Sequence, residues 1–261
     1  MNLADYYAFT QELTTNLQAD PKILGLVLLG STANQSRQPD AYSDHDFFVI
    51  TESGSQEDYR TDLTWLPDYT TIVLNVRETA HGLKVLYKNG HLLEFAVFDT
   101  EEIALAKVND YAIAFDKANV TEAITSIATS EHQELTSDTL DKHHGMFLCL
   151  LVVGAGRVAR GEIISGQLFI RANALSQLLQ ILAHTHPADD KSQLDNLDPF
   201  RRFEQVFPEI GAQINAALLQ DPITGALSLL AIYEQTQSSQ VAYRGEAVKT
   251  VRKFLEQVET C

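Results

Sequence analysis

Long uncharged apolar segments and cysteine are scarce in this sequence. The longest apolar candidate, residues 146–154, is far shorter than the roughly 20 apolar residues that span a bilayer. Residues 1–20 contain three acidic side chains and lack the basic start and apolar centre of a signal peptide. Two cysteines, Cys149 and Cys261, do not make a disulfide framework, and we interpret Cys149 as a buried apolar residue. We therefore expect a cytoplasmic protein that does not associate with membranes.

Basic charge is also scarce. The 19 Lys and Arg residues are outnumbered by 35 Asp and Glu residues, which gives a net charge of −16 with histidine neutral. Proteins that bind nucleic-acid chains gain most of their affinity by neutralising phosphates with Lys and Arg. The composition therefore disfavours polymeric nucleic acid as a partner. It suits a cationic small molecule, which a negative surface would attract.

The first half of the chain mixes helix and strand patterns. Apolar residues at helical spacing predict a helix over residues 4–17. Apolar runs bounded by turn residues predict strands at 23–29, 44–51, 71–76, 83–87, 91–98 and 111–115. Asn89-Gly90 between two of these runs is typical of a β-hairpin, and a two-residue loop there would place Val85 opposite Glu94.

Strand patterns stop near residue 120. Apolar residues at three- and four-residue steps then predict helices at 140–160, 168–184, 200–219, 223–234 and 248–258. We therefore predict an α+β protein. A mixed β-sheet with flanking helices would occupy residues 1–120, and an all-α helical bundle would occupy residues 121–261.

The residues with the clearest chemistry lie at 28–50. Side chains alternate across a strand, so Asp44 and Asp46 point to one face and His45 points to the other, where we expect packing or a structural hydrogen bond. Two ionised carboxylates close together repel each other unless a cation lies between them. Mg²⁺ suits this position, since it takes oxygen ligands and is commonly held by one or two carboxylates plus substrate phosphates.

Glu94 is a third carboxylate of the same kind. It lies within a run so apolar that we expect its strand to be buried, where an unpaired ionised group is costly. A metal shared with Asp44 and Asp46 would supply the missing charge. Gly30-Ser31 follows the first strand, and glycine allows close approach of backbone to a ligand, while free N–H groups at a helix start favour phosphate. A phosphate site beside a metal site is what phosphoryl or nucleotidyl transfer needs.

These residues, in this order, resemble a known signature. Gly30-Ser31, followed after twelve residues by Asp44 and Asp46 and later by Glu94, resembles the polymerase-β-type nucleotidyltransferase superfamily. Residues 30–50, 65–68 and 86–98 are similar to the aminoglycoside and lincosamide nucleotidyltransferases, and the resemblance covers residues 24–115. The sequence departs from the family at Glu94, where many relatives have Asp, and at Thr32, where many have Arg.

The resemblance implies a nucleotidyltransferase domain with a helical C-terminal domain. It implies that Gly30 and Ser31 hold the triphosphate, and that Asp44, Asp46 and Glu94 are the catalytic residues and bind metal, which we expect to be two Mg²⁺ ions. Glu94 would complete the acceptor-side metal site or take the proton from the acceptor as a general base.

We therefore expect a metal-dependent enzyme that moves NMP, expected to be AMP from ATP, to a hydroxyl of a small-molecule acceptor and releases pyrophosphate. The acceptor would bind between the domains, and an antibiotic is one candidate. Two alternatives stay open: transfer of AMP to a protein side chain, as in other members of this superfamily, and a nucleotide-binding regulatory module without turnover. The sequence leaves the oligomeric state open.

Three other groups of polar residues give weaker signals of a functional role. His143 and His144 diverge on a helix and have no Cys or His at metal-binding spacing, so we do not expect zinc there. We interpret Lys142 as a solvated lysine near a helix start. Glu162 is a reserve candidate for a base, although Gly161 suggests that it belongs to a charged helix end.

Overall fold

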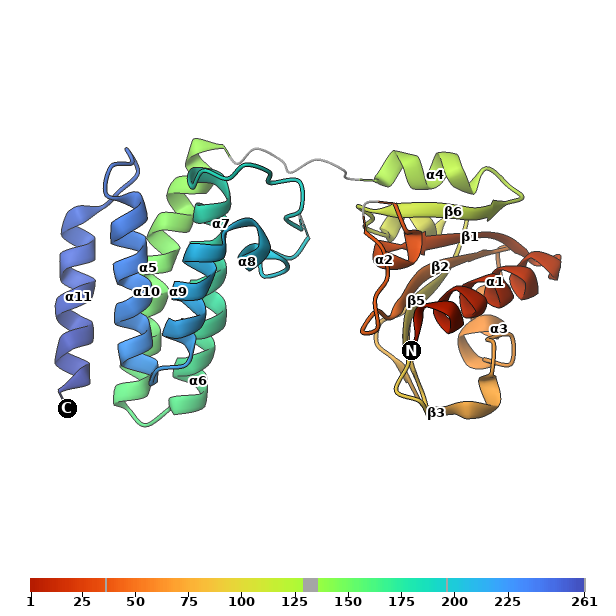
Figure 1. Ribbon diagram of the computed structural model, residues 1–261, viewed down its shortest axis with the longest axis horizontal. Coiled ribbons are helices and arrows are strands. Elements are labelled where there is room, and N and C mark those ends of the chain that lie inside the picture. Colours follow the sequence, from red (N-terminus) through yellow and green to blue (C-terminus); the bar gives the residue numbers. More distant parts are fainter. Residues whose placement is uncertain (36, 129–135, 196, 261) are drawn as a thin grey trace. The chain divides into compact units, whose positions relative to one another are not determined.

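A computed structural model describes residues 1–35, 37–128, 136–195 and 197–260 (Figure 1). The chain divides into two compact units, Met1–Glu131 and His132–Cys261. By its contacts, helix α4 (Val120–Ile127) belongs to the first unit, so this division lies further along the chain than the predicted boundary at residue 120. No helix among the described residues is long and apolar enough to cross a membrane. Cys261 lies outside the described residues.

The first unit contains a six-stranded mixed sheet in the order β3-β4-β5-β2-β1-β6. Strands β2 and β5 are parallel and all other neighbours are antiparallel. Each predicted strand is present within one residue of its expected bounds. The strands are β1 (Ile23–Leu29), β2 (His45–Thr51), β3 (Ile72–Arg77), β4 (Gly82–Tyr87), β5 (Leu92–Asp99) and β6 (Tyr111–Asp116).

Two apolar clusters lie on opposite faces of this sheet because side chains alternate along each strand. Phe47 and Val49 of β2 join the first cluster, which is covered by α1 (Leu3–Ala19) and α3 (Gln56–Thr61). Ile50 of β2 joins the second cluster, which is covered by the short 3₁₀ helix η2 (Glu102–Leu105) and by α4. Both faces of the central strands are therefore buried along most of their length. The short helix α2 (Gly30–Ala33) and the 3₁₀ turn η1 (Tyr69–Thr71) complete the unit.

The hairpin between β4 and β5 is present, but its predicted register is wrong. The loop has three residues, Lys88 to Gly90, and Gly90 adopts φ +84° while its N–H donates to the Tyr87 carbonyl oxygen at 2.9 Å. A turn closed by a left-handed glycine adds one residue to the expected two-residue loop. As a result Glu94 faces Lys84, and the fully buried Val85 faces Leu93 on the opposite side of the sheet.

The regular structure described in the second unit, over residues 136–195 and 197–260, is helical, and the buried apolar residues described there form one cluster. The α+β class predicted from the sequence is thereby confirmed. The predicted helix over 200–219 is wrong in one respect, because it is broken at Phe207 (φ −125°, ψ 68°). Pro208 disfavours a helical conformation in the residue before it, and α9 starts at this proline. The helices are α5 (Ser137–Ala159), α6 (Ile163–Leu168), the π-helical η3 (Phe169–Ala174), α7 (Leu175–Thr185), α8 (Phe203–Val206), α9 (Pro208–Leu218), α10 (Pro222–Gln237) and α11 (Gly245–Glu259).

Two glycines allow α5 to pass very close to the segment formed by α6 and η3. A Cβ atom on Gly154 would lie 2.6 Å from Ile170 Cγ1 and 3.1 Å from the Gly166 carbonyl oxygen. Cys149, on the outer side of the same helix, is exposed, so the prediction that it is buried is wrong. The helix turns the neighbouring Phe147 and Leu148 to the core instead.

Candidate functional site

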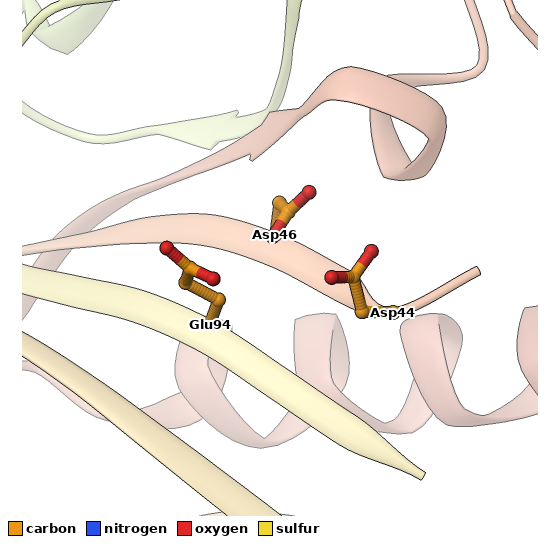
Figure 2. Close-up of side chains that lie close together, drawn as sticks. All are labelled: Asp44, Asp46 and Glu94. Carbon is orange, nitrogen blue, oxygen red and sulfur yellow. The ribbon is translucent and has the colours of Figure 1, made fainter. Parts of the chain in front are cut away.

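The three predicted carboxylates lie together at one end of the central strands (Figure 2). Asp44 immediately precedes β2, Asp46 is the second residue of β2, and Glu94 lies directly beside Asp46 in the parallel β2–β5 pair. One oxygen from each carboxylate lies within 4.8 Å of the other two. The parallel register therefore brings together residues that are 48 positions apart in the sequence (94 minus 46).

Glu94 is exposed, contrary to the prediction that its strand buries it. Its side chain keeps 47% of its accessible surface, because the cluster beneath α4 and η2 covers Ala96 and Phe98 on the same face but does not reach Glu94. A lysine supplies the compensating charge. Lys84 Nζ lies 3.3 Å from Glu94 Oε2 and 3.0 Å from Glu78 Oε1, and these contacts, with Glu78 contributing most, raise the pKa of Lys84.

The Gly30-Ser31 turn lies beside the carboxylates. Gly30 starts α2 with φ +50°, a left-handed conformation that favours glycine, and its N–H donates to the Asp110 carbonyl oxygen at 2.9 Å. A Cβ atom at this position would lie 3.5 Å from Asp46 Oδ2. The expected short helix start after β1 is therefore present, and a side chain at Gly30 would meet the Asp46 carboxylate.

A buried polar network lies behind the carboxylates, on the opposite side of β2. His45 is fully buried and stacks on the Tyr6 ring at 3.8 Å, which confirms the expected structural role for this histidine. Its Nε2 lies 2.8 Å from Thr10 Oγ1 and its Nδ1 lies 2.8 Å from Nε2 of His91. Sequence reasoning did not connect Tyr6, Thr10 or His91 with the site.

The hydrogen bonds fix the proton positions in both histidines. Thr10 donates its hydroxyl proton to the Tyr6 carbonyl oxygen, so Thr10 Oγ1 accepts from His45 Nε2. His45 Nδ1 is then an acceptor and His91 Nε2 donates to it. Burial, reinforced by the neighbouring imidazole, lowers the pKa of His45 to about 3. Burial lowers the pKa of His91 to about 4, aided by the N-terminal amino group and opposed by Asp44. Both rings are neutral at pH 7.

The remaining sequence candidates lie in the second unit and make ordinary structural contacts. His143 Nδ1 lies 2.8 Å from Gln177 Oε1, and the fully buried His144 lies 2.7 Å from the Tyr233 hydroxyl. Glu162 pairs with Arg160 at 3.0 Å, after Gly161 ends α5 with φ +79°. Within the part of the chain that the structure describes, the carboxylates of Asp44, Asp46 and Glu94 are the one group of three potential metal ligands.

The donor set fits a hard divalent cation. Three carboxylates offer only oxygen ligands, and Mg²⁺ and Mn²⁺ favour oxygen over nitrogen or sulfur. The site is open to solvent at Glu94, which leaves room for water or substrate oxygens in the rest of a coordination sphere.

No family model matches the sequence, and no curated protein matches it. Solved structures to which the chain is similar include an aminoglycoside 6-adenyltransferase from Bacillus subtilis, at 12% identity and TM-score 0.39, over 97% of this chain and 98% of that chain. A second is the STING-associated CdnE c-di-GMP synthase from Capnocytophaga granulosa, at 14% identity and TM-score 0.27, over 96% of this chain and 78% of that chain. A third is the E. coli MS115-1 CdnC:HORMA-deltaN complex, at 12% identity and TM-score 0.28, over 93% of this chain and 92% of that chain.

An aminoglycoside adenyltransferase is thus among the solved structures to which this chain is similar. The TM-scores are low, so the function proposed below rests on the residues of this chain.

Proposed function

We propose that the protein is a divalent-cation-dependent nucleotidyltransferase. It transfers NMP, with ATP as the expected donor, to a hydroxyl group of a small molecule. The acceptor oxygen attacks the α-phosphorus, the bond from that phosphorus to the α,β-bridging oxygen breaks, and pyrophosphate leaves. The acceptor proton passes to a base or to solvent.

The observation that carries this proposal is the convergence of three carboxylates beside a glycine turn. One oxygen each of Asp44, Asp46 and Glu94 lies within 4.8 Å of the other two, and Gly30 lies so near that a Cβ atom on it would be 3.5 Å from Asp46 Oδ2. A carboxylate cluster with a close backbone approach provides the two sides of a triphosphate site, one for cations and one for phosphate oxygens.

The residues have distinct tasks in this proposal. Asp44 and Asp46 would hold the cations, and Glu94 would complete the site on the side where Lys84 now lies. Two Mg²⁺ ions, when bound, would neutralise triphosphate charge and activate the acceptor hydroxyl. Gly30 and Ser31 would orient the phosphates. Glu94, the most exposed of the three carboxylates, would alternatively accept the proton of an acceptor that arrives from solvent.

The test is turnover with a matched inactive variant. Purified protein is incubated with each of the four NTPs, Mg²⁺ and a library of hydroxyl-bearing acceptors that includes cationic aminoglycosides. Pyrophosphate release is measured and the products are identified by mass spectrometry. Mg·NTP at about a hundred times its dissociation constant should also stabilise the fold by about 2.7 kcal/mol.

The expected result is one acceptor whose mass increases by a nucleotidyl group, with no increase for Asp46→Asn. A parallel incubation with labelled ATP in cell lysate tests other acceptors. Label found only on protein would replace the small-molecule acceptor by a protein side chain, and label extending a nucleic acid would contradict the expectation drawn from the net charge. Absence of both turnover and Mg·NTP stabilisation at millimolar concentrations would reject the proposal.

A further inference from the structure

The backbone that carries Asp44 and Asp46 is held by two buried hydroxyl groups from other elements. The Tyr6 hydroxyl of α1 lies 2.8 Å from the Asp44 carbonyl oxygen and 2.8 Å from Thr32 Oγ1. Thr32 belongs to α2, and its Oγ1 lies 3.0 Å from the Asp46 backbone nitrogen. Tyr6 and Thr32 are 2% and 5% exposed, so water does not replace these bonds easily.

The direction of each bond follows from its donors. The Asp44 carbonyl can only accept, so the Tyr6 hydroxyl proton goes to it, and Tyr6 must accept from Thr32. The Asp46 N–H can only donate, so Thr32 Oγ1 accepts from it. The bonds therefore run in one direction, from Asp46 N–H through the Thr32 and Tyr6 hydroxyls to the Asp44 carbonyl. A chain of this kind is mutually reinforcing.

This hydroxyl chain spans the three residues that set the spacing of the two aspartates. It begins and ends on the Asp44–Asp46 backbone, and His45 between them is fixed by stacking on Tyr6. Thr32 is two residues after Gly30, so the same hydroxyl also ties the glycine turn to the start of β2. Neither Tyr6 nor Thr32 is among the carboxylate ligands, and their hydroxyls act on the backbone.

We propose that Tyr6 and Thr32 are positioning residues that hold Asp44 and Asp46 in metal-binding geometry relative to the Gly30-Ser31 turn. The inference rests on the proposed function, because it assumes that these carboxylates bind a divalent cation. Residues that orient metal ligands in this way commonly change metal affinity or activity by about 10- to 100-fold when removed.

The test measures binding of Mn²⁺ alone to the full chain, by electron paramagnetic resonance of the free ion. Thr32→Val removes the hydroxyl and keeps the shape, and Tyr6→Phe does the same for the phenol. We expect each to weaken Mn²⁺ binding by about 10- to 100-fold. The double variant should be hardly weaker than either single variant, because both hydroxyls belong to one chain.

Two further variants separate positioning from folding. Thr32→Ser keeps the hydroxyl and should restore affinity to near the wild-type value. Thr51→Val removes a fully buried hydroxyl from the far end of β2 and should leave Mn²⁺ binding unchanged. Melting temperatures measured in parallel identify any variant whose loss of affinity comes from unfolding.

The outcomes separate the two proposals. Mn²⁺ binding by wild type that Asp46→Asn does not weaken would reject the proposed metal site, and the positioning role with it. Mn²⁺ binding that Asp46→Asn abolishes but Thr32→Val and Tyr6→Phe leave unchanged would overturn the positioning role alone. A Thr32→Ser variant as weak as Thr32→Val would also overturn it, since packing and not the hydroxyl would then be responsible.

Discussion

At the scale of single residues, Glu94 is placed between charges of opposite sign. Asp44 and Asp46 lie on one side of it and Lys84 on the other, and the lysine also contacts Glu78. In the metal-free protein, Lys84 relieves part of the repulsion that the clustered carboxylates would otherwise feel. A structural role for the Lys84–Glu94 pair would be small, because exposed ion pairs contribute about 0–1 kcal/mol.

We expect Glu94→Gln to abolish most turnover while leaving the metal-free fold about as stable as the wild type. The substitution removes a proposed metal ligand, and it also removes repulsion with the two aspartates. The measurements are pyrophosphate release with Mg²⁺ and the melting temperature in the presence of a chelator. Asp44→Asn and Asp46→Asn should behave in the same way.

Glu78→Gln is the matched control, because Glu78 contacts the same lysine but does not belong to the carboxylate group. It should keep wild-type turnover. A Glu94→Gln protein that melts well below wild type yet releases pyrophosphate at the wild-type rate would show that Glu94 is structural.

The buried histidine pair predicts a pH dependence of stability. His45 and His91 have native pKa values of about 3 and about 4, below the value near 6.5 expected in the unfolded chain. As the pH falls below about 6.5, the unfolded chain binds protons that the native state does not, so stability falls. Each histidine adds a slope approaching about 1.4 kcal/mol per pH unit until its native pKa is reached.

The measurement is urea unfolding of the metal-free protein between pH 5 and 8. His91→Gln keeps a donor toward His45 and removes one titrating group, so its free energy of unfolding should depend less steeply on pH below about 6. Equal slopes for wild type and His91→Gln would show that His91 is not held neutral in the native state.

Among the helices and strands, the strands could be predicted wherever an apolar run bounded by turn residues has one clear interpretation. The largely buried strands β1 and β2 were predicted because apolar runs ending at turn residues have few alternatives. The register of the β4–β5 hairpin was not, since Asn89-Gly90 is compatible with loops of two or three residues. The third loop residue decides whether Glu94 faces Val85 or Lys84, and therefore whether a positive charge lies beside its carboxylate.

Close packing between α5 and the α6–η3 segment predicts opposite effects for two substitutions in one helix. In Gly154→Ala the new methyl group would meet Ile170 and the backbone of Gly166, and the variant should be destabilised by about 1–3 kcal/mol. Gly145→Ala meets no atom within 4 Å and should stabilise the same helix by up to about 1 kcal/mol. Urea unfolding measures both. Equal effects at the two positions would contradict the close approach at Gly154.

At the scale of the whole molecule, the two units have separate apolar cores. Among the residues that the structure describes, the clusters on the two faces of the sheet extend to Ala128, and the helical cluster begins at Leu140. We therefore expect a fragment of residues 1–131 to unfold cooperatively and to bind Mn²⁺ with the affinity of the full chain. Denaturant unfolding and Mn²⁺ titration of the fragment test this. A fragment without a cooperative transition would mean that its core depends on the second unit.

The polar network behind the site shows what sequence reasoning misses. Tyr6 falls within the helix predicted over residues 4–17, Thr32 stands out in the sequence only as a departure from relatives, and nothing local to either connects them with Asp46. A hydrogen bond between residues 14 or more positions apart leaves no periodic pattern, whereas a buried strand does. Asp44 and Asp46 were found because two carboxylates so close together repel each other. Glu94 was selected because its apolar strand was expected to bury it, although the structure leaves its side chain exposed.

The parallel pairing of β2 with β5 also constrains the order in which the site assembles. The antiparallel pairs β3–β4 and β4–β5 are joined by short loops. Strands β2 and β5 are neighbours in the sheet, but α3, β3 and β4 separate them along the chain. Contacts between distant segments pay more loop-closure entropy and form late. Under the proposed function, Mn²⁺ capture by all three carboxylates would mark the pairing of β5 with β2, and Mn²⁺ uptake during refolding would time the docking of the hairpin onto β2.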